Sequence, residues 1–225
     1  MTVKQLRRLH PIFIYRGFSV KYLNNNLTFT ADFFVAPNIE FHPQVTIFNV
    51  SRAQYQAIPQ PVLKNMAFHL GLAEIPSYWK AACSPTIIIE AGNLNKDQLR
   101  WWKNFIIEGL GEFFFINQID FTAGDFLTIK TTDNKSRKLP VLRFTAKTKT
   151  TLVPIGGGKD SIVTLELLKS GLPIVLFSLN PTSAAENIIR SESKIKSTIA
   201  KRKIDPVLLD LNRRDQPPPA PAVLG

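Results

Sequence analysis

The sequence of 225 residues contains one cysteine, three histidines and two methionines. A single cysteine excludes an internal disulfide, and the histidines at positions 10, 42 and 69 have no metal-ligand spacing with Cys83, so we predict no structural metal. No apolar run is long enough to cross a bilayer, and the N-terminus lacks an apolar segment followed by a cleavage site of small residues. We therefore expect a cytoplasmic protein without membrane insertion.

Acidic residues are also few, with 17 Asp and Glu against 28 Lys and Arg, which gives a net charge of +11. The basic excess is concentrated in residues 130–149 and 190–203. Neither tract has the interleaved aromatic residues that are typical of single-stranded RNA readers, so a solvated surface is favoured and nucleic acid is not a favoured partner. The alternative is attraction for small polyanions. The sequence gives no indication of the oligomeric state.

A hydrophobic content of 44% predicts a packed core. The chain is organised around residues 151–181, which predict a short strand, a glycine turn, a helix with Ile162, Leu165 and Leu168 at helical spacing, and a second strand from Pro173. Glycines between a strand and a helix let backbone N–H groups converge at the positive end of the helix, where a phosphate can bind. The alternative is a turn that only caps the helix.

The turn itself, GGGKDS at residues 156–161, excludes two common phosphate-binding motifs. A Walker loop requires glycine where Val153 stands and a serine or threonine where Asp160 stands. A dinucleotide-binding fingerprint requires a third glycine at the position of Ser161. A different class of phosphate loop is therefore indicated.

The loop and the strand before it resemble the SGGxDS pyrophosphate loop of the ATP pyrophosphatases, which cleave ATP between the α- and β-phosphates and adenylate a carbonyl or carboxylate oxygen. Gly156 stands where that family usually has serine, which removes one hydroxyl donor. The glycine-first form, together with EIPSYWKAACSP at 74–85 and GLGEFFFINQIDF at 109–121, resembles the UDP-N-acetylmuramoyl-L-alanyl-L-glutamate epimerases, the MurL family of peptidoglycan precursor synthesis. The similarity covers roughly residues 62–212.

This resemblance implies an ATP-dependent epimerase, an isomerase that inverts the terminal L-Glu of UDP-MurNAc-L-Ala-L-Glu to D-Glu through an acyl-adenylate and releases AMP and pyrophosphate. It implies ATP and Mg²⁺ as cofactors, with Asp160 as a Mg²⁺ ligand and Lys159 stabilising the leaving pyrophosphate. The implied nucleotide-binding residues are Gly156, Gly157, Gly158, Lys159, Asp160 and Ser161. Two alternatives stay open: a tRNA-modifying ATP pyrophosphatase with the same loop, and an inactive nucleotide-binding fragment.

Residues 74–85 are the most chemically varied region before the glycine loop. They predict a short helix after Pro76 on which Trp79 and Cys83 share a face. A lysine or a thiol can move a proton at carbon if burial tunes its pKa, so Lys80 and Cys83 are candidates for proton transfer. The alternatives are a surface charge for Lys80 and a small buried hydrophobe for Cys83.

The predicted fold class is α/β. Residues 1–148 form a mixed α+β N-terminal substrate domain, residues 149–212 form a partial, parallel-sheet nucleotide-binding domain like that of the ATP pyrophosphatases, and residues 213–225 form a disordered proline-rich tail. Three strands and two helices are too few to cover both faces of such a sheet, so we expect a C-terminally truncated version of the family. Independent activity of this chain is then doubtful.

Several local signals predict individual elements. Asn24, Asn25 and Asn26 predict a turn between two strands, and Gly71 predicts the end of a helix that covers residues 59–70. Asn95 with Gln98 predicts a capping box at a helix start, and the apolar run at 113–116 is expected inside the protein. The polar residues near that run are either satisfied by backbone partners or part of a site: Glu112, Asn117, Gln118 and Asp120.

The C-terminal part is expected to have the order β-α-β-α-β. Ser183 with Glu186 predicts a second capping box, which opens a helix to about residue 201, and residues 206–211 predict the third strand. With right-handed crossovers these strands form a parallel sheet, and the nucleotide binds at the C-terminal edge of the strands.

Overall fold

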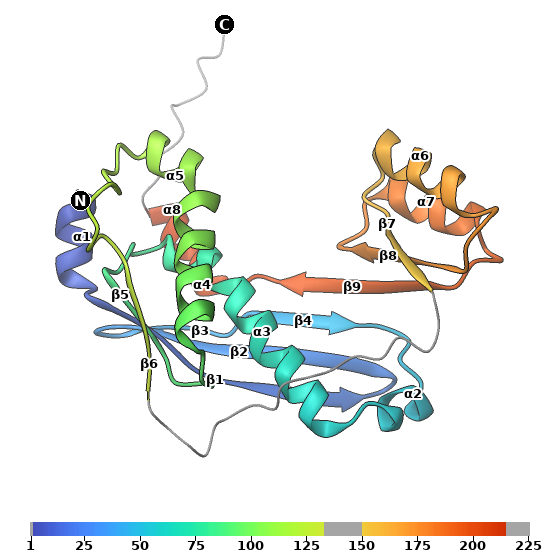
Figure 1. Cartoon of the computed structure of the whole chain (residues 1–225), viewed down its shortest axis with the longest axis horizontal. Helices are drawn as coiled ribbons and strands as arrows, with labels where there is room; N and C mark the ends of the chain where they lie inside the picture. Colours follow the sequence, from blue (N-terminus) through green and yellow to red (C-terminus); the bar gives the residue numbers. More distant parts are fainter. Residues whose placement is uncertain (1, 133–149, 215–225) are drawn as a thin grey trace, which may run out of the picture.

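The computed structural model describes residues 2–132 and 150–214, which contain eight helices and nine strands (Figure 1). The helices are α1 (Val3–Leu9), α2 (Arg52–Ala57), α3 (Gln60–Trp79), α4 (Lys96–Gly109), α5 (Gly111–Ile116), α6 (Lys159–Leu168), α7 (Ser183–Ser191) and α8 (Pro206–Arg214). The strands are β1 (Ile12–Leu23), β2 (Asn26–Val35), β3 (Ile39–Phe41), β4 (Gln44–Ile47), β5 (Thr86–Ile89), β6 (Thr128–Thr131), β7 (Thr151–Pro154), β8 (Ile174–Leu179) and β9 (Ser197–Lys203).

These strands form one mixed sheet in the order β6-β5-β1-β2-β4-β9-β8-β7, with β3 paired to β2. The ladder is parallel at both ends, where β1, β5 and β6 run together and β7, β8 and β9 run together, and antiparallel between them. The α/β fold class is confirmed. The pairing of β4 with β9 joins the two predicted domains in one sheet, and the division between residues 148 and 149 stays a prediction.

The long hairpin of β1 and β2 has its turn where the asparagines predicted one. β1 pairs antiparallel with β2 from Phe13 opposite Val35 to Leu23 opposite Asn26. Asn24 and Asn25 both have positive φ, 49° and 57°, which is the backbone conformation of a two-residue type I′ turn. The turn prediction is therefore confirmed, because asparagine tolerates this conformation better than most residues.

The long helix α3 corrects the prediction of a helix that ends at Gly71. A Cβ on that residue would lie 2.0 Å from the Tyr15 hydroxyl oxygen, so the glycine permits close packing of α3 on β1. Pro76 removes one helix hydrogen bond, at about 3 kcal/mol for an interior position. Burial of each large apolar side chain beyond it, such as Trp79 at 0% exposure, stabilises the helix by about 1.5–3 kcal/mol, so the helix persists.

The C-terminal elements keep the predicted β-α-β-α-β order, but the last strand was assigned to the wrong residues. Residues 206–211 lie in helix α8, and β9 occupies residues that were predicted to continue a helix. β9 pairs with β8 on one side and β4 on the other, and this long-range pairing overrides local helical spacing. α8 reaches into the first two residues of the predicted tail, and residues 215–225 lie outside the described part.

The N-terminus of α7 differs from the prediction by one residue. Thr182, and not Ser183, is the N-cap, and its hydroxyl oxygen accepts a hydrogen bond from the Ala185 N–H at 3.2 Å. Serine is on average the better N-cap, but here Thr182 has the extended N-cap backbone and Ser183 is already the first helical residue, so the general preference does not decide the position. The capping box at Asn95 and Gln98 of α4 is confirmed, with both reciprocal hydrogen bonds at 2.9 Å.

Helices α6 and α7 lie together on one side of the β7–β9 ladder (Figure 1). Their shared core contains Val153, Leu165 and Leu176, all at most 1% exposed, and it is separate from the larger core around α3. On the opposite face of the same strands, Leu152 and Leu179 are 57% and 48% exposed. Within the described ranges, this end of the sheet is therefore covered on one face.

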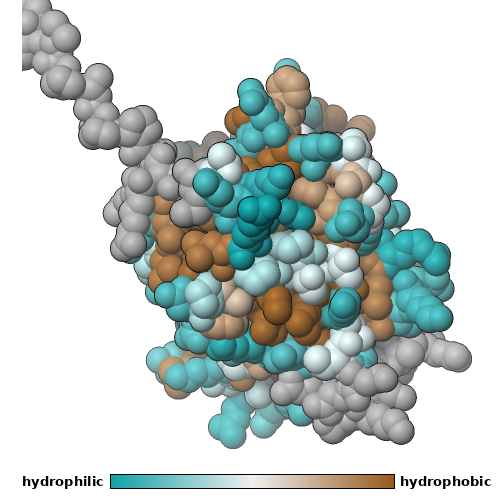
Figure 2. Space-filling view, turned by 90° about the vertical axis from the view of Figure 1, so that its left-hand side faces the viewer, coloured by the Kyte–Doolittle hydropathy of each residue, from teal (hydrophilic) through white to brown (hydrophobic). Residues whose placement is uncertain are grey.

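The apolar run of α5 is only partly inside, which corrects the prediction for residues 113–116. Phe114 is 1% exposed, whereas Phe115 and Ile116 are 84% and 66% exposed. A helix at the rim of a core presents only one of its sides to that core. The side of the molecule that carries α1, viewed in Figure 2, shows apolar areas interrupted by hydrophilic ones.

Candidate functional site

The glycine loop connects the carboxyl end of β7 to the first turn of α6. Ile155 is buried and fixed by two hydrogen bonds: its N–H donates to the Phe177 carbonyl at 2.7 Å, and its carbonyl accepts from the Ser178 hydroxyl at 2.7 Å. Beyond this anchor Gly156 and Gly158 are exposed, and a Cβ built on either meets no atom within 4 Å. The loop therefore borders open space, which leaves room for a bound phosphate.

Gly157 has a different environment from its neighbours. Its φ is +92°, and a Cβ there would lie 2.7 Å from the Thr182 hydroxyl oxygen and 3.0 Å from the Ala185 backbone nitrogen. Only glycine fits both the backbone conformation and this contact. The loop is thereby held against the N-terminus of α7, so the positive ends of α6 and α7 lie beside the same loop.

This convergence was missed at the sequence level. Thr182 also approaches the loop through its hydroxyl, which donates to the Gly156 carbonyl at 3.4 Å. The sequence did contain a signal for this second helix end. Asn180, Pro181 and Thr182 stand between the second predicted strand and the second predicted helix. A right-handed crossover places the N-terminus of that helix at the same sheet edge as the glycine loop. Two helix ends attract an anion more strongly than one.

The start of α6 leaves its amide groups without a side-chain cap. Gly158 is the N-cap and forms no side-chain hydrogen bond, and the Ser161 hydroxyl donates to the Gly158 carbonyl at 2.7 Å. Lys159 and Asp160 are exposed in the first turn. The arrangement supplies backbone donors, one cation and one hydroxyl around the open side of the loop, which is the donor set that a phosphate requires.

A magnesium site at this loop would rest on one carboxylate. Across residues 2–132 and 150–214, no group of three or more His, Cys, Asp and Glu residues could hold a metal ion. Asp160 therefore fits Mg²⁺ only as a single ligand, with the other oxygens coming from phosphates and water, as is usual for this ion.

Cys83 lies in the core and not on a helix, which corrects the predicted helix after Pro76. It follows the end of α3 with a φ of +53°, is 1% exposed, and its N–H donates to the Trp79 carbonyl at 2.7 Å. Arg7 donates to the Cys83 carbonyl at 2.6 Å and approaches the sulfur at 3.7 Å. Burial raises the pKa of the Cys83 thiol, an effect that the Arg7 guanidinium partly opposes. The native thiol is therefore a protonated core group at neutral pH.

Lys80 is separated from Cys83 and lies at the C-terminal end of α3, where it is exposed. It lines a cavity of about 420 Å³ together with Arg202 of β9 and apolar side chains from α5 and the chain after β9. Arg202 is held by a bidentate pair with Glu74, with nitrogen–oxygen distances of 2.7–2.9 Å, and these hydrogen bonds raise the pKa of Arg202. Arg202 was not identified as a site residue from the sequence.

The polar residues around α5 mostly make local contacts. The Asn117 side chain donates to the Phe113 carbonyl at 2.8 Å, and Asp120 accepts from both the N–H and the hydroxyl of Thr122. These Thr122 hydrogen bonds lower the pKa of the Asp120 carboxyl. The contacts match a structural role for both residues at the end of α5.

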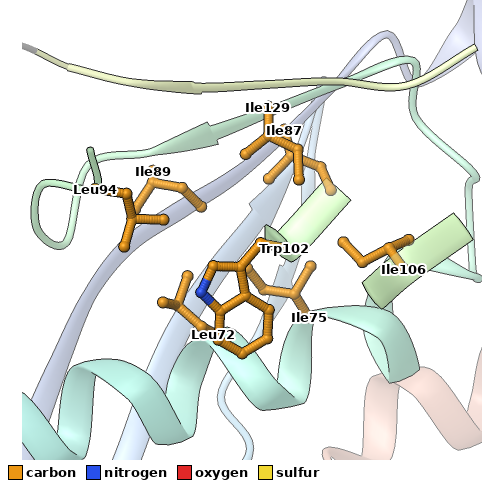
Figure 3. A pocket seen from close by; sticks show the side chains of 8 residues that line it. All are labelled: Leu72, Ile75, Ile87, Ile89, Leu94, Trp102, Ile106 and Ile129. Carbon is orange, nitrogen blue, oxygen red and sulfur yellow. The ribbon is translucent and has the colours of Figure 1, made fainter. Parts of the chain in front are cut away.

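A small cavity inside the larger core carries no comparable chemistry (Figure 3). It has a volume of about 10 Å³ and is lined only by apolar side chains, among them Leu72 and Ile75 of α3 and Trp102 of α4. A buried water needs polar partners, which this lining does not offer. The cavity is a packing void.

Comparison with known protein families shows to which family this chain belongs. The MurL N-terminal domain model matches residues 5–216, which include the glycine loop, Lys80 and Arg202. The chain belongs to the MurL N-terminal domain family. The resemblance inferred from the three sequence segments is therefore confirmed at the level of the family.

Two curated relatives of this MurL domain carry the name UDP-N-acetyl-alpha-D-muramoyl-L-alanyl-L-glutamate epimerase. The protein of Salinispora tropica is 31% identical over 137 residues, and that of a Micromonospora species is 32% identical over 145 residues. Each alignment covers 60% of this chain and 29% of the relative, so the chain spans less than a third of the curated relatives it matches. No solved structure matches the chain significantly. Among the helices described for this MurL domain, none combines the length and hydrophobicity needed to traverse a bilayer.

Proposed function

We propose that this MurL domain binds ATP at its glycine loop and takes part in the inversion of the terminal L-Glu of UDP-MurNAc-L-Ala-L-Glu to D-Glu. The observation that supports ATP binding is the open loop at residues 156–158, held by Gly157 against a second helix N-terminus. The names of the two curated relatives support the epimerase activity and the substrate.

The chemistry explains why such an inversion uses ATP. Removal of the α-hydrogen next to a carboxylate would place a second negative charge beside the first. When an oxygen of the α-carboxylate attacks the α-phosphorus and pyrophosphate leaves, the carboxylate becomes an ester-like carbonyl that can stabilise an enolate. A proton then leaves the α-carbon and another is added to the opposite face, and water cleaves the adenylate to D-Glu and AMP.

The residues of the loop have distinct roles in this proposal. The backbone N–H groups at the start of α6 and the Lys159 ammonium stabilise charge on the β- and γ-phosphates as pyrophosphate leaves. Ser161 would donate to a phosphate oxygen once its hydroxyl turns from the Gly158 carbonyl, and Asp160 would hold Mg²⁺. Lys80 and Cys83 remain the candidates for proton transfer, and Cys83 can serve only if its sulfur becomes accessible.

The proposal is tested by isotope incorporation in D₂O with ATP, Mg²⁺ and UDP-MurNAc-L-Ala-L-Glu. We expect pyrophosphate release together with deuterium at the α-position of the terminal glutamate, measured by mass spectrometry. Pyrophosphate release without deuterium would reject epimerisation and retain adenylation. If neither pyrophosphate nor deuterium incorporation were found, and ATP did not bind in a calorimetric titration, the proposed nucleotide site would be rejected as well.

A further inference from the structure

The sheet face that carries α6 and α7 continues beyond these helices along β9, which runs on past the ends of β7 and β8 towards α8 (Figure 1). Val153 and Leu176 pack against α6 and α7 on this face, and Leu176 is paired with Ser197 of β9. Side chains alternate along a strand, so every second residue after Ser197 lies on the same face. Lys201 and Lys203 are therefore on the face of the glycine-loop helices, and both are exposed.

Two rows of polar side chains cross this face from β1 to β9. Strand pairing places Lys21, Thr28, Thr46 and Lys201 in the first row, and Ser19, Thr30, Gln44 and Lys203 in the second. The two threonine hydroxyl groups of the first row are hydrogen-bonded to each other at 3.0 Å. Asp32 belongs to the next row, and its carboxylate lies 3.5 Å from the His42 ring. The two rows thus offer hydroxyl, amide and ammonium groups and no negative charge.

The two lysines of β9 can act together on one anion. Within residues 2–132 and 150–214 neither ammonium forms an ion pair, and that of Lys201 lies 6.0 Å from the centre of the Phe48 ring. Alternate residues of a strand are about 6.6 Å apart, so both flexible side chains can reach the two phosphates of a single diphosphate. The hydroxyl and amide groups beside them can bind the hydroxyls of a sugar.

The strand register sets the distance between these lysines and the glycine loop. Pro154, at the end of β7, is level with Phe177 of β8 and Thr198 of β9. Lys201 is three residues beyond that level, about 10 Å along β9, and β9 is two strand spacings, again about 10 Å, from β7. The backbones of the two lysines are thus about 14–19 Å from the end of β7. Only an extended ligand can occupy both places.

We propose that Lys201 and Lys203 bind the diphosphate of the UDP-MurNAc-peptide substrate while its terminal glutamate lies at the glycine loop. This inference rests on the proposed function. The alanine and glutamate span about 7 Å when extended, and the lactoyl group and sugar ring bring the distance from the glutamate carboxyl to the diphosphate to about 15 Å. This length matches the separation of the two places. The substrate then lies along the open face, with its sugar over the hydroxyl and amide groups of the two rows.

Two double variants separate this role from a general effect of charge. Lys201→Gln with Lys203→Gln removes both positive charges and keeps polar side chains. The matched control, Lys194→Gln with Lys196→Gln, changes two exposed lysines just before the start of β9. Both variants lower the net charge equally, so only the position of the lost charges differs. Since all four side chains are exposed, both variants should unfold in urea near the wild-type midpoint.

The test is calorimetric titration of the full chain and both variants with UDP-MurNAc-L-Ala-L-Glu, UDP, MurNAc-L-Ala-L-Glu and ATP–Mg²⁺. We expect the Lys201 and Lys203 variant to bind the first two compounds about tenfold or more weakly, because a hydrogen bond to a charged group contributes about that factor. Its affinity for MurNAc-L-Ala-L-Glu, which lacks the diphosphate, and for ATP–Mg²⁺ should stay within about threefold of the wild type. The control variant should stay within about threefold for all four compounds.

Other outcomes overturn the assignment. Weaker binding of ATP–Mg²⁺ by the Lys201 and Lys203 variant would show that these lysines bind ATP, and weaker binding of MurNAc-L-Ala-L-Glu would show that they bind the peptide or the sugar. Equal losses in the control variant would reduce the effect to net charge. No binding of UDP by the wild-type chain would also reject the proposal. The two proposals fail separately, because absence of ATP binding rejects the glycine-loop site, whereas the UDP titration tests the lysines.

Discussion

The substitution Gly157→Ala tests the geometry of the glycine loop. A non-glycine residue at φ +92° costs about 1–2 kcal/mol, as estimated for left-handed backbone. Its Cβ would also lie 2.7 Å from the Thr182 hydroxyl and 3.0 Å from a backbone nitrogen of α7, and overpacking of this kind costs about 1–3 kcal/mol. We therefore expect α6 and α7 to be destabilised by about 2–5 kcal/mol.

Two measurements report the effect of Gly157→Ala. Urea denaturation gives the free energy of unfolding, and amide hydrogen exchange shows whether the loss is confined to α6 and α7, whose core is separate from the larger one. The affinity for ATP–Mg²⁺ should fall at least tenfold, because the loop can no longer stay against the N-terminus of α7.

The matched control is Gly156→Ala. Its Cβ meets no atom within 4 Å, and Gly156 is not among the residues with positive φ. Stability should change by less than about 1 kcal/mol, and ATP affinity should stay near that of the wild type. If Gly157→Ala matched the wild type in both stability and ATP affinity, the account of the loop would be refuted.

Three further outcomes are expected. Gly156→Ser should bind ATP at least as tightly as the wild type in calorimetric titration, because it adds a hydroxyl donor; a weakened complex would contradict the loop assignment. Glu74→Gln should lower the free energy of unfolding in urea by about 1–3 kcal/mol, since it removes the charged partner of Arg202. At pH 8 Cys83 should resist iodoacetamide in the native chain and react once unfolded, because burial both shields the thiol and raises its pKa; fast native labelling would place it outside the core.

Elements set by local chemistry were predictable from the sequence. The asparagines at 24 and 25 tolerate positive φ, Asn95 caps a helix through its own side chain, and three glycines separate a short strand from a helix. For the asparagines the deciding interactions lie within a few residues, so the sequence contains the whole signal. The glycine loop is predictable as a turn, but it is also held by Thr182, which is distant in the sequence.

Elements set by long-range contacts were not predictable in this way. Gly71 has the composition of a helix stop, but its lack of a side chain serves the contact with Tyr15, more than fifty residues earlier. The last strand lies at residues 197–203, where the end of a helix was predicted, and α8 occupies the residues predicted as that strand. Pairing of β9 with β4, which is distant in the sequence, determines which segment is extended.

The residues of the candidate site also differ in how far they could be predicted from local sequence. The residues of the glycine loop were found because they are consecutive, whereas Arg202 and Thr182 act through partners that are distant in the sequence. Lys80 and Cys83 were grouped by proximity along the chain, and the structure separates them into an open cavity and a core.

The most direct test of the central claim, that the loop after β7 binds the phosphates of ATP, is nuclear magnetic resonance of the ¹⁵N-labelled chain during titration with ATP–Mg²⁺. The account predicts the largest amide shifts at residues 156–161, with smaller ones at the start of α7. Shifts that leave these amides unchanged and cluster elsewhere, or no shifts at millimolar ATP, would contradict it.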